Sequence, residues 1–202
     1  MNKTLHLIRH GLALHNEKFL EMGMNVNAFR LPEVTDAPLI EEGHYQSINL
    51  GNNWTEKYNI ELVIVSPLMR TLETAVNIFG DTDIPIISKE FLREYPVGRD
   101  TCNKRSDISL LKNKFPGISF EIKENRDIYW HKDEKDMETM MELDQRIEEM
   151  KKFILQREEN NIAIVSHSSY LGQFKDNYIS LMENGDTELK HCYPYKYELK
   201  YD

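Results

Sequence analysis

The segment LHLIRHGLALHN, residues 5–16, decides the fold and raises the question of function. Its apolar first half is typical of a short buried strand, which ends on Arg9 and His10 and is followed at once by Gly11. Strands often end in polar residues and glycine where the chain leaves the core, so the tripeptide alone is a weak signal. A guanidinium beside an imidazole at a strand end also suits a catalytic pocket, and residues elsewhere in the chain have to decide between these two interpretations.

Length and composition favour one ordinary globular α/β domain over residues 1–202. Hydrophobic residues make up 40% of the chain and charged residues 29%, and no internal repeat or Gly/Pro-rich linker divides it. No apolar run is as long as the roughly 18 residues that a membrane span needs, and the apolar start ends at Arg9, too early for a signal peptide. Cys102 and Cys192 fit neither metal-ligand spacing nor a disulfide framework, so we expect a reducing, cytoplasmic location.

The net charge of −9 argues against nucleic acid as a partner, because phosphate backbones bind to basic faces. A small phosphorylated substrate remains compatible with this charge, since two or three arginines in a cleft create a local positive potential. We therefore expect a small phosphorylated molecule as the partner, with no nucleic acid and no membrane, while the oligomeric state stays open.

Hydrophobic periodicity predicts strands that alternate with helices along the chain. Besides the strand that ends at Arg9, short apolar strands are expected at residues 60–67, 84–88 and 161–169, and an alternating edge strand at residues 196–201. Helices are expected at residues 40–58, 66–80, 140–154 and 170–182, whereas residues 31–43 are rich in turns and residues 90–136 are irregular. This alternation predicts a three-layer αβα sandwich with a mainly parallel central sheet.

The helix expected at residues 66–80 has clear end signals. Ser66 occupies an N-cap position, Pro67 the first helical position, and Gly80 suits the C-terminal stop. Its apolar face is expected to consist of Leu68, Leu72, Ala75, Val76 and Phe79.

Three of the expected strands end in residues of matching chemistry. The first ends in Arg9 and His10, the strand at 60–67 is followed by Arg70, and the strand at 161–169 contains His167. Each has a structural alternative, because Arg70 can be a solvated helix residue and His167 a capping histidine. In a parallel sheet, however, the carboxyl ends of the strands meet at one edge and form the binding crevice, which brings two histidines and two arginines together.

These residues suit phosphoryl transfer. Guanidinium groups bind phosphoryl oxygens in a bidentate manner, and a neutral imidazole, whose pKa nearby arginines lower, can attack phosphorus. A second imidazole can donate to an oxygen of the transition state. The chemistry needs neither a metal nor a cofactor, and we expect none; His6 and His10 are four residues apart but on a strand, so they do not form a helical metal pair.

Four ordered motifs resemble those of the histidine phosphatase superfamily, also called phosphoglycerate mutase-like proteins. They are RHG at residues 9–11 with Asn16 shortly after it, DAPLIEEGHYQ at 36–46, SPLMRTLETA at 66–75 and IAIVSHSSYL at 162–171. The resemblance implies a phosphoglycerate mutase-like fold. It also implies that His10 carries the phosphoryl group and that Arg9, Arg70 and His167 bind it.

The resemblance also implies a proton donor for the leaving group, in a variable loop after the third strand. Glu94, in the sequence LRE, is the candidate, and Glu90 is the less favoured substitute. Contacts to the substrate are expected from Asn16, Ser168, Arg99, Lys104 and Arg105, although a solvated surface role suits the last three equally well.

The sequence favours a phosphatase over a mutase. Phosphoglycerate mutases of this superfamily carry a longer insert after the acid, with a Glu-Arg-Tyr-Gly-like stretch and paired arginines, which REYPVGRDTCNKR, residues 93–105, lacks. A mutase and a non-catalytic phospho-ligand-binding module on the same fold are the alternatives. The sequence leaves the identity of the phosphorylated substrate open.

Overall fold

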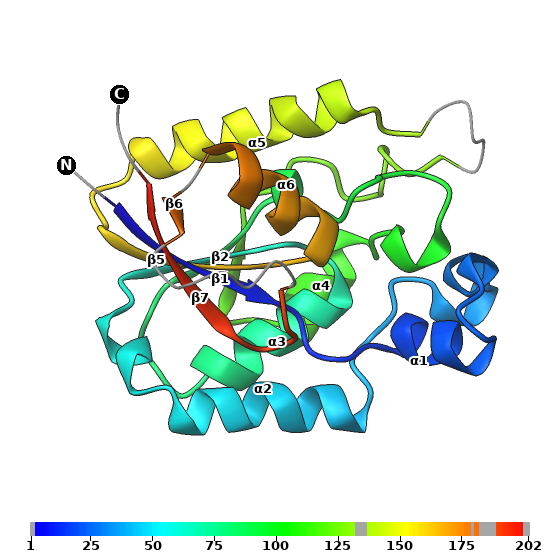
Figure 1. Cartoon of the computed structure of the whole chain (residues 1–202), viewed down its shortest axis with the longest axis horizontal. Coiled ribbons are helices and arrows are strands. Elements are labelled where there is room, and N and C mark those ends of the chain that lie inside the picture. Colours follow the sequence, from blue (N-terminus) through cyan, green and yellow to red (C-terminus); the bar gives the residue numbers. More distant parts are fainter. Residues whose placement is uncertain (1–2, 132–136, 179, 182–188, 200–202) are drawn as a thin grey trace.

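A seven-stranded sheet runs through the computed structural model, which describes residues 3–131, 137–178, 180–181 and 189–199 (Figure 1). The strands are β1 (Lys3–Arg9), β2 (Leu62–Val65), β3 (Ile86–Ser88), β4 (Ile118–Phe120), β5 (Asn161–Ser166), β6 (Ser180–Leu181) and β7 (Pro194–Leu199). Their order is β4-β3-β2-β5-β1-β7-β6. The pairs from β4 to β1 are parallel, and β7 is antiparallel to both β1 and β6.

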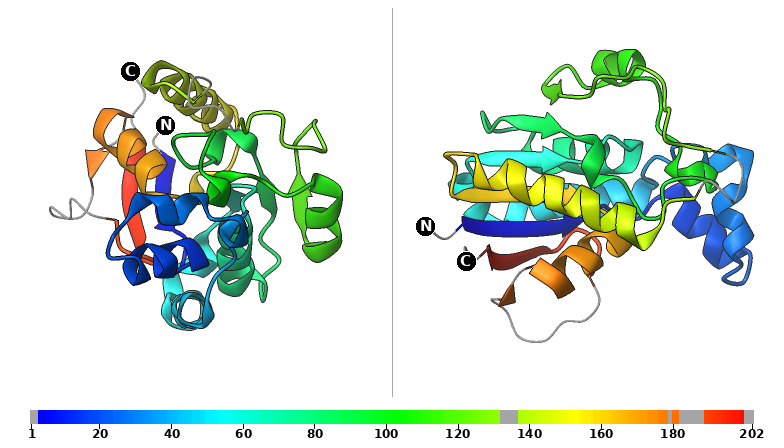
Figure 2. Two further views of the ribbon diagram at one scale, coloured as in Figure 1. Left: turned by 90° about the vertical axis from the view of Figure 1, so that its right-hand side faces the viewer. Right: turned by 90° about the horizontal axis from the view of Figure 1, so that it is seen from above.

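Helices cover both faces of this sheet, which confirms the predicted three layers (Figure 2). The α-helices are α1 (Leu14–Glu21), α2 (Glu41–Asn53), α3 (Met69–Phe79), α4 (Ile108–Lys114), α5 (Met140–Leu155) and α6 (Ser168–Tyr178). Short 3-10 helices are η1 (Val26–Arg30), η2 (Pro32–Val34), η3 (Thr55–Asn59), η4 (Glu90–Leu92) and η5 (Thr101–Asn103). None of the helices within the described residues is long and apolar enough to cross a membrane.

The alternation of side chains along the strands produces two separate cores. Leu5 and Leu7 of β1 pack with α5 and α6 on one face, while Ile8 packs with α2, α3 and α4 on the other. Strands buried on both faces explain why the central ones read as continuous apolar runs rather than alternating ones. The sheet is therefore fixed from both sides, and the ends of its strands form a rigid base for a site.

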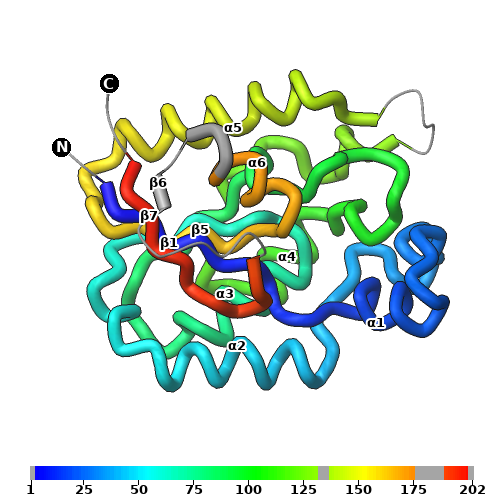
Figure 3. The backbone as a smooth tube through the Cα atoms, viewed as in Figure 1, coloured from blue at the N-terminus to red at the C-terminus, as the bar shows by residue number. Residues whose placement is uncertain are grey.

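The three strand ends singled out in the sequence lie side by side. β5 pairs with β1 on one side and with β2 on the other, and Arg9 is in register with Ser166. The backbone N–H of His10 continues the ladder by donating to the carbonyl of Ser166 at 3.0 Å. The predicted convergence at the carboxyl edge of a parallel sheet is confirmed. From this edge α1 and η1 extend beyond the sheet, at the right of Figure 3.

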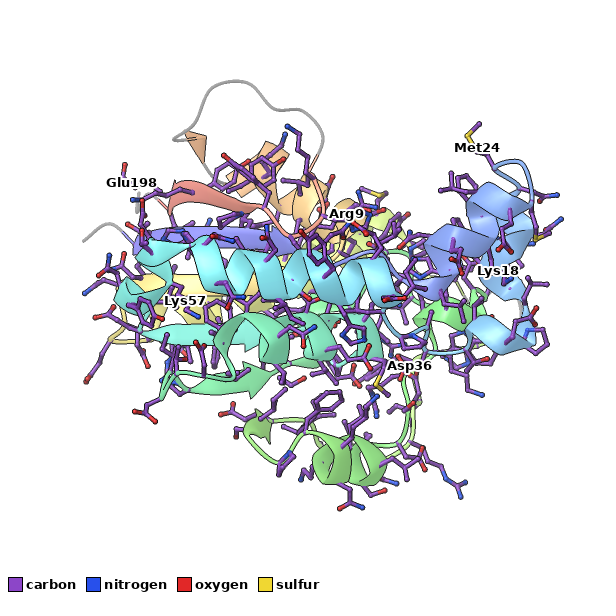
Figure 4. The ribbon with its side chains drawn as sticks, turned by 90° about the horizontal axis from the view of Figure 1, so that it is seen from below. Arg9, Lys18, Met24, Asp36, Lys57 and Glu198 are labelled. Carbon is purple, nitrogen blue, oxygen red and sulfur yellow. The ribbon has the colours of Figure 1, made fainter. Side chains whose placement is uncertain are left out.

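The start of α3 differs from the prediction. The helix begins at Met69, so Ser66 is not its N-cap and Pro67 is not its first residue. The side chain of Asp36 provides the cap from outside the helix: Oδ1 accepts from the Met69 N–H and Oδ2 from the Ser106 N–H, both at 2.8 Å. Asp36, labelled in Figure 4, thus ties the residues after η5 to α3.

Other predicted elements also needed correction. Residues 196–201 were expected to form an edge strand, but β7 lies between β1 and β6, and alternating exposure alone does not distinguish these positions. The segment 90–136, expected to be irregular, contains α4 and β4, which are too short to show a period. Val76 is 38% exposed and lies outside the apolar face of α3, and the helix expected at 170–182 begins at Ser168.

Gly11 owes its place to a close approach rather than to an unusual backbone angle. A Cβ on Gly11 would lie 2.5 Å from the carbonyl oxygen of Gly43 in α2, and a Cβ on Gly43 would lie 2.0 Å from that of Leu12. Neither glycine is among the described residues with positive φ. The glycine after His10 therefore lets α2 pack directly against the chain that leaves the sheet.

Candidate active site

His10 lies at the end of β1 with its ring held in one orientation. Its Nδ1 is 2.7 Å from the carbonyl oxygen of Gly11, an acceptor, so Nδ1 carries the proton and Nε2 keeps its lone pair. The Nε of Arg70 lies 3.3 Å from that Nε2 and donates to it. The neighbouring Gly11 N–H donates to Thr74 Oγ1 at 3.0 Å, which fixes the backbone beside the ring. His10 therefore presents a lone pair toward a guanidinium.

The surroundings keep this imidazole neutral. Burial, then the positive charge of Arg70 and the neighbouring histidines His167, His15 and His191, hold the pKa of His10 well below its usual range. Because only the neutral ring is a nucleophile, this shift makes the reactive form available at neutral pH.

Arg70, in the first turn of α3, is buried and held by the chain between the Glu94 loop and α4. Its NH1 donates to the carbonyl of Cys102 at 2.7 Å and its NH2 to Asn103 Oδ1 at 2.8 Å. Asn103 is thus a site residue that the sequence analysis missed, because an asparagine in an irregular segment belongs to no recognisable pattern. The two contacts fix the plane of the guanidinium beside His10.

His167 follows β5 directly and lies against His10, with the ring centroids 5.2 Å apart. Its Nε2 is 2.8 Å from Ser66 Oγ, which gives Ser66 a role other than the predicted N-cap. Burial and then the charge of Arg70 hold the pKa of His167 well below its usual range. Its Nδ1 is buried without a hydrogen-bond partner within the described residues.

Arg9 completes the positive side of the site. It is half-buried, and its NH1 donates to the carbonyl of Leu189 at 3.1 Å. In Figure 4 the label of Arg9 lies near the centre of the view, at the end of β1, whereas the exposed Met24 lies at the upper right, beyond α1. The positive charge of Arg9 lowers the pKa values of His15 and His191, so it lies on the same side of the sheet edge as the imidazoles.

Glu94 lies against the beginning of α6. Its Oε1 accepts from the backbone N–H of Tyr95 at 2.8 Å and of Tyr170 at 3.1 Å. Burial raises the pKa of the Glu94 carboxyl, while these N–H donors and the charge of Arg70 act in the opposite direction. The net effect is a raised pKa for Glu94, which is the direction that a proton donor requires.

The loop that carries Glu94 is fastened to α5. Arg146 donates to the carbonyls of Phe91 and Arg93, each at 2.9 Å, and is paired with Glu138. Glu90, the less favoured acid, is bound to the guanidinium of Arg105 at 2.6 Å. Glu94, whose pKa is raised by burial, stays the predicted proton donor.

The five residues expected to contact substrate occupy different environments. Arg105 is buried, and its five N–H groups donate to Glu90 and to the carbonyls of four residues, Ser106, Glu124, Asn125 and Arg126. No donor of Arg105 is left for a substrate, so the prediction for this residue is replaced by a structural role.

The other four remain predictions. Asn16 Oδ1 accepts from the backbone N–H of Ala13 and so caps α1, and the half-exposed Ser168 begins α6 beside His167. Lys104 is exposed, with Nζ 4.6 Å above the ring centre of Trp130. The Nε of Arg99 lies 3.5 Å from a carboxylate oxygen of Asp100.

Two further histidines, missed by the sequence analysis, line the site. The ring of His15 in α1 lies 5.8 Å from that of His10, and the ring of His191 lies 5.5 Å from it. His191 Nδ1 donates to the backbone carbonyl of His10, and the pKa of His191 is lowered to about 4, first by burial and then by Arg9. His15 stands only five residues after His10, but its approach to that ring depends on the turn at Gly11 and on α1. Among the described residues no group of three or more histidine, cysteine or acidic side chains is arranged to hold a metal ion.

Comparison with known proteins agrees with this geometry. The model of the histidine phosphatase superfamily (branch 1) matches residues 5–181. The chain belongs to the histidine phosphatase superfamily. Among its relatives in that superfamily is a phosphoglycerate mutase-like protein of Arabidopsis thaliana, 33% identical over 201 residues, a match that covers 84% of this chain and 72% of the relative.

Solved structures of the histidine phosphatase superfamily share the fold. A putative alpha-ribazole-5′-P phosphatase from Escherichia coli superposes with a TM-score of 0.59 at 21% identity and covers 88% of this chain and 80% of its own. A mycobacterial glucosyl-3-phosphoglycerate phosphatase has a TM-score of 0.55 at 19% identity, with 85% and 79% covered. The predicted family and its α/β fold are thus confirmed, and phosphatases are among the structural neighbours.

Proposed function

We propose that this chain is a phosphatase that hydrolyses a small phosphomonoester through a phosphohistidine intermediate on His10. One observation carries the proposal above all others. The Nδ1 proton of His10 is committed to the Gly11 carbonyl, so the lone pair on Nε2 lies beside Arg70, where a phosphoryl group bound by the guanidinium would be held.

The first step forms a bond from His10 Nε2 to phosphorus and breaks the bond from phosphorus to the substrate oxygen. Arg9, Arg70 and His167 bind the non-bridging oxygens, and the Nε–H of Arg70, which donates to His10 Nε2, donates to a phosphoryl oxygen once that nitrogen bonds to phosphorus. Glu94 gives its proton to the departing oxygen, so an alcohol leaves rather than an alkoxide. The raised pKa of Glu94 and the lowered pKa of His10 both favour the required protonation states.

The second step returns the enzyme to its starting state. The Glu94 carboxylate takes a proton from a water molecule, whose oxygen attacks phosphorus while the bond to His10 Nε2 breaks. Inorganic phosphate leaves, and Glu94 is again protonated. These steps use only side chains of the site, and we propose that they proceed without a metal. The free thiols of Cys102 and Cys192 are consistent with the proposed cytoplasmic location.

The proposal is tested by phosphate release and by trapping. Release of inorganic phosphate is measured across a panel of sugar phosphates, phosphoglycerates, nucleotides and alkyl phosphates, and brief incubation with labelled substrate is followed by acid or alkaline quench. We expect turnover and a protein-bound label that is acid-labile and base-stable. His10→Ala should lose both, whereas His44→Ala, which alters a partly exposed histidine of α2, should keep both.

Three results would contradict the proposal. Label that persists in His10→Ala would remove the nucleophile assignment. Phosphate exchange between positions of a substrate without release of inorganic phosphate would identify a mutase. Binding of phosphorylated ligands with neither label nor turnover would identify a binding module on the same fold.

A further inference from the structure

His15 reaches the site from α1, whereas His10, Arg70 and His167 come from the end of β1, from α3 and from the end of β5. It is in the first turn of α1, is only 7% exposed, and lies with its ring 5.8 Å from that of His10 and edge-on to Phe29 at 5.8 Å. The 5.8 Å joins the centroids of the His10 and His15 rings, so the facing ring edges are closer than this, and a phosphoryl oxygen about 2.9 Å from a nitrogen of His15 has to lie beside the line between the two rings. His15 thus lines the site beside the nucleophile.

The proton of the His15 ring can be assigned from its surroundings. Nδ1 is buried and has no hydrogen-bond partner within the part of the chain that the structure describes. A buried N–H without a partner is rarer and more costly than a lone pair without one, so the proton resides on Nε2. His15 therefore offers an N–H donor on the ring nitrogen farther from its own backbone.

The charge state of His15 is equally defined. Burial first, and then the charges of Arg70 and Arg9, hold the pKa of His15 well below its usual range, so the ring is a neutral donor. A neutral donor adds a hydrogen bond to a phosphoryl dianion without repelling the two guanidinium groups that bind it. His191 differs, because its Nδ1 proton is already committed to the His10 carbonyl.

We propose that His15 is a further phosphoryl-binding residue, which donates its Nε2 proton to a non-bridging oxygen of the group held at His10. This inference rests on the proposed function, because it assumes that the phosphoryl group is bound beside His10. It extends the site from the strand ends to α1, so that α1 contributes directly to the affinity for anions.

Isosteric variants test which nitrogen acts. The amide nitrogen of glutamine mimics Nε2 of histidine, and that of asparagine mimics Nδ1, while phenylalanine keeps a ring and removes both. Affinity for inorganic phosphate and for orthovanadate is measured by isothermal titration calorimetry, which does not depend on turnover. We expect His15→Gln to bind within about threefold of the parent protein. His15→Asn and His15→Phe should bind roughly 10- to 100-fold more weakly, the usual worth of a hydrogen bond to a charged group.

The outcomes separate this inference from the proposed function. Unchanged phosphate and vanadate affinity in His15→Phe would overturn it, as would tighter binding by His15→Asn than by His15→Gln. Thermal unfolding of each variant shows whether the fold is kept, and if His15→Phe unfolds, the comparison of the two amide variants still decides. If the parent protein binds the anions in a His15-dependent manner but never turns over a phosphomonoester, the proposed function fails while the binding role of His15 stands.

Discussion

Gly43 in α2 offers the most direct test of how the fold positions the nucleophile. In Gly43→Ala the added Cβ would lie 2.0 Å from the Leu12 carbonyl oxygen and 2.8 Å from its nitrogen, both backbone atoms that cannot rotate away. Ordinary contact begins near 3.4 Å, so α2 or the Leu12 segment has to retreat by about 1.4 Å. That retreat also pulls on the bonds from Ile40 N–H to the Leu12 carbonyl and from Leu12 N–H to Gln46 Oε1.

The expected loss of stability is large for a single methyl group. Overpacking costs about 1–3 kcal/mol, and two weakened hydrogen bonds add about 1 kcal/mol each, which gives about 3–5 kcal/mol. For a chain of 202 residues each kcal/mol lowers the Tm by about 2–4 °C, so we expect a fall of about 6–20 °C. Activity should fall as well, because Leu12 lies two residues after His10.

Gly172 in α6 is the matched control. No atom lies within 4 Å of a Cβ built on it, so Gly172→Ala should gain the helical preference of alanine, about 0.5–1 kcal/mol, and raise the Tm by a few degrees. Urea unfolding and thermal scans of the two variants measure both values. Equal Tm values, or a Gly43→Ala protein as stable as the parent, would refute the argument from the close approach of α2.

Three further predictions concern the chemistry and the effect of pH. Glu94→Gln should slow hydrolysis of an alkyl phosphate by about two to four orders of magnitude. It should affect p-nitrophenyl phosphate much less, because nitrophenolate leaves without a proton. Equal slowing of both substrates would indicate a structural role for Glu94 instead. Arg70→Lys keeps the charge but loses the planar fork held by Cys102 and Asn103, so kcat/KM should fall strongly, and wild-type kinetics would exclude Arg70 as a phosphoryl ligand. His6 has a pKa lowered to about 4, chiefly by burial, against 6.5 when unfolded, so the unfolded chain takes up the proton first. The stability contributed by neutral His6 is complete above pH 6.5 and is lost as the pH falls to about 4, by at most about 3 kcal/mol. Urea unfolding of His6→Gln between pH 7 and pH 4 should show a correspondingly shallower decline, and an unchanged decline would contradict the shift.

The parallel sheet and the position of its strand ends were predictable from the alternation of strands and helices along the sequence. Apolar strands bounded by polar residues identified β1, β2 and β5, and the rule for parallel sheets then placed Arg9, Arg70 and His167 at one edge. Short elements were not predictable. β4 has three residues and α4 seven, too few for a period of 2.0 or 3.6 to be recognised among turns. β7 alternates like an edge strand, yet a two-residue partner covers its outer side.

The site residues that the sequence did not predict were missed for one physical reason. His15 and Asn103 reach the site through tertiary packing of α1 and of the segment around η5, and no spacing along the chain encodes that approach. Ser66 carried a valid N-cap signal, but the cap of α3 comes from Asp36, which lies 33 residues away from Met69 in the sequence. A local sequence signal of this kind shows that a side chain can form a hydrogen bond, but the tertiary fold determines which group it bonds to.

Part of the irregular segment after β3 is held through its backbone, which leaves the side chains at those positions replaceable. Arg105 and Arg146 fasten it through backbone carbonyls, which every amino acid supplies. The positions that contribute only a carbonyl to these contacts, Glu124 and Arg126, can therefore mutate without releasing the guanidinium of Arg105 that binds them. Evolution or a directed library can vary these positions at small cost to the fold, because the contacts that hold Arg105 stay in place.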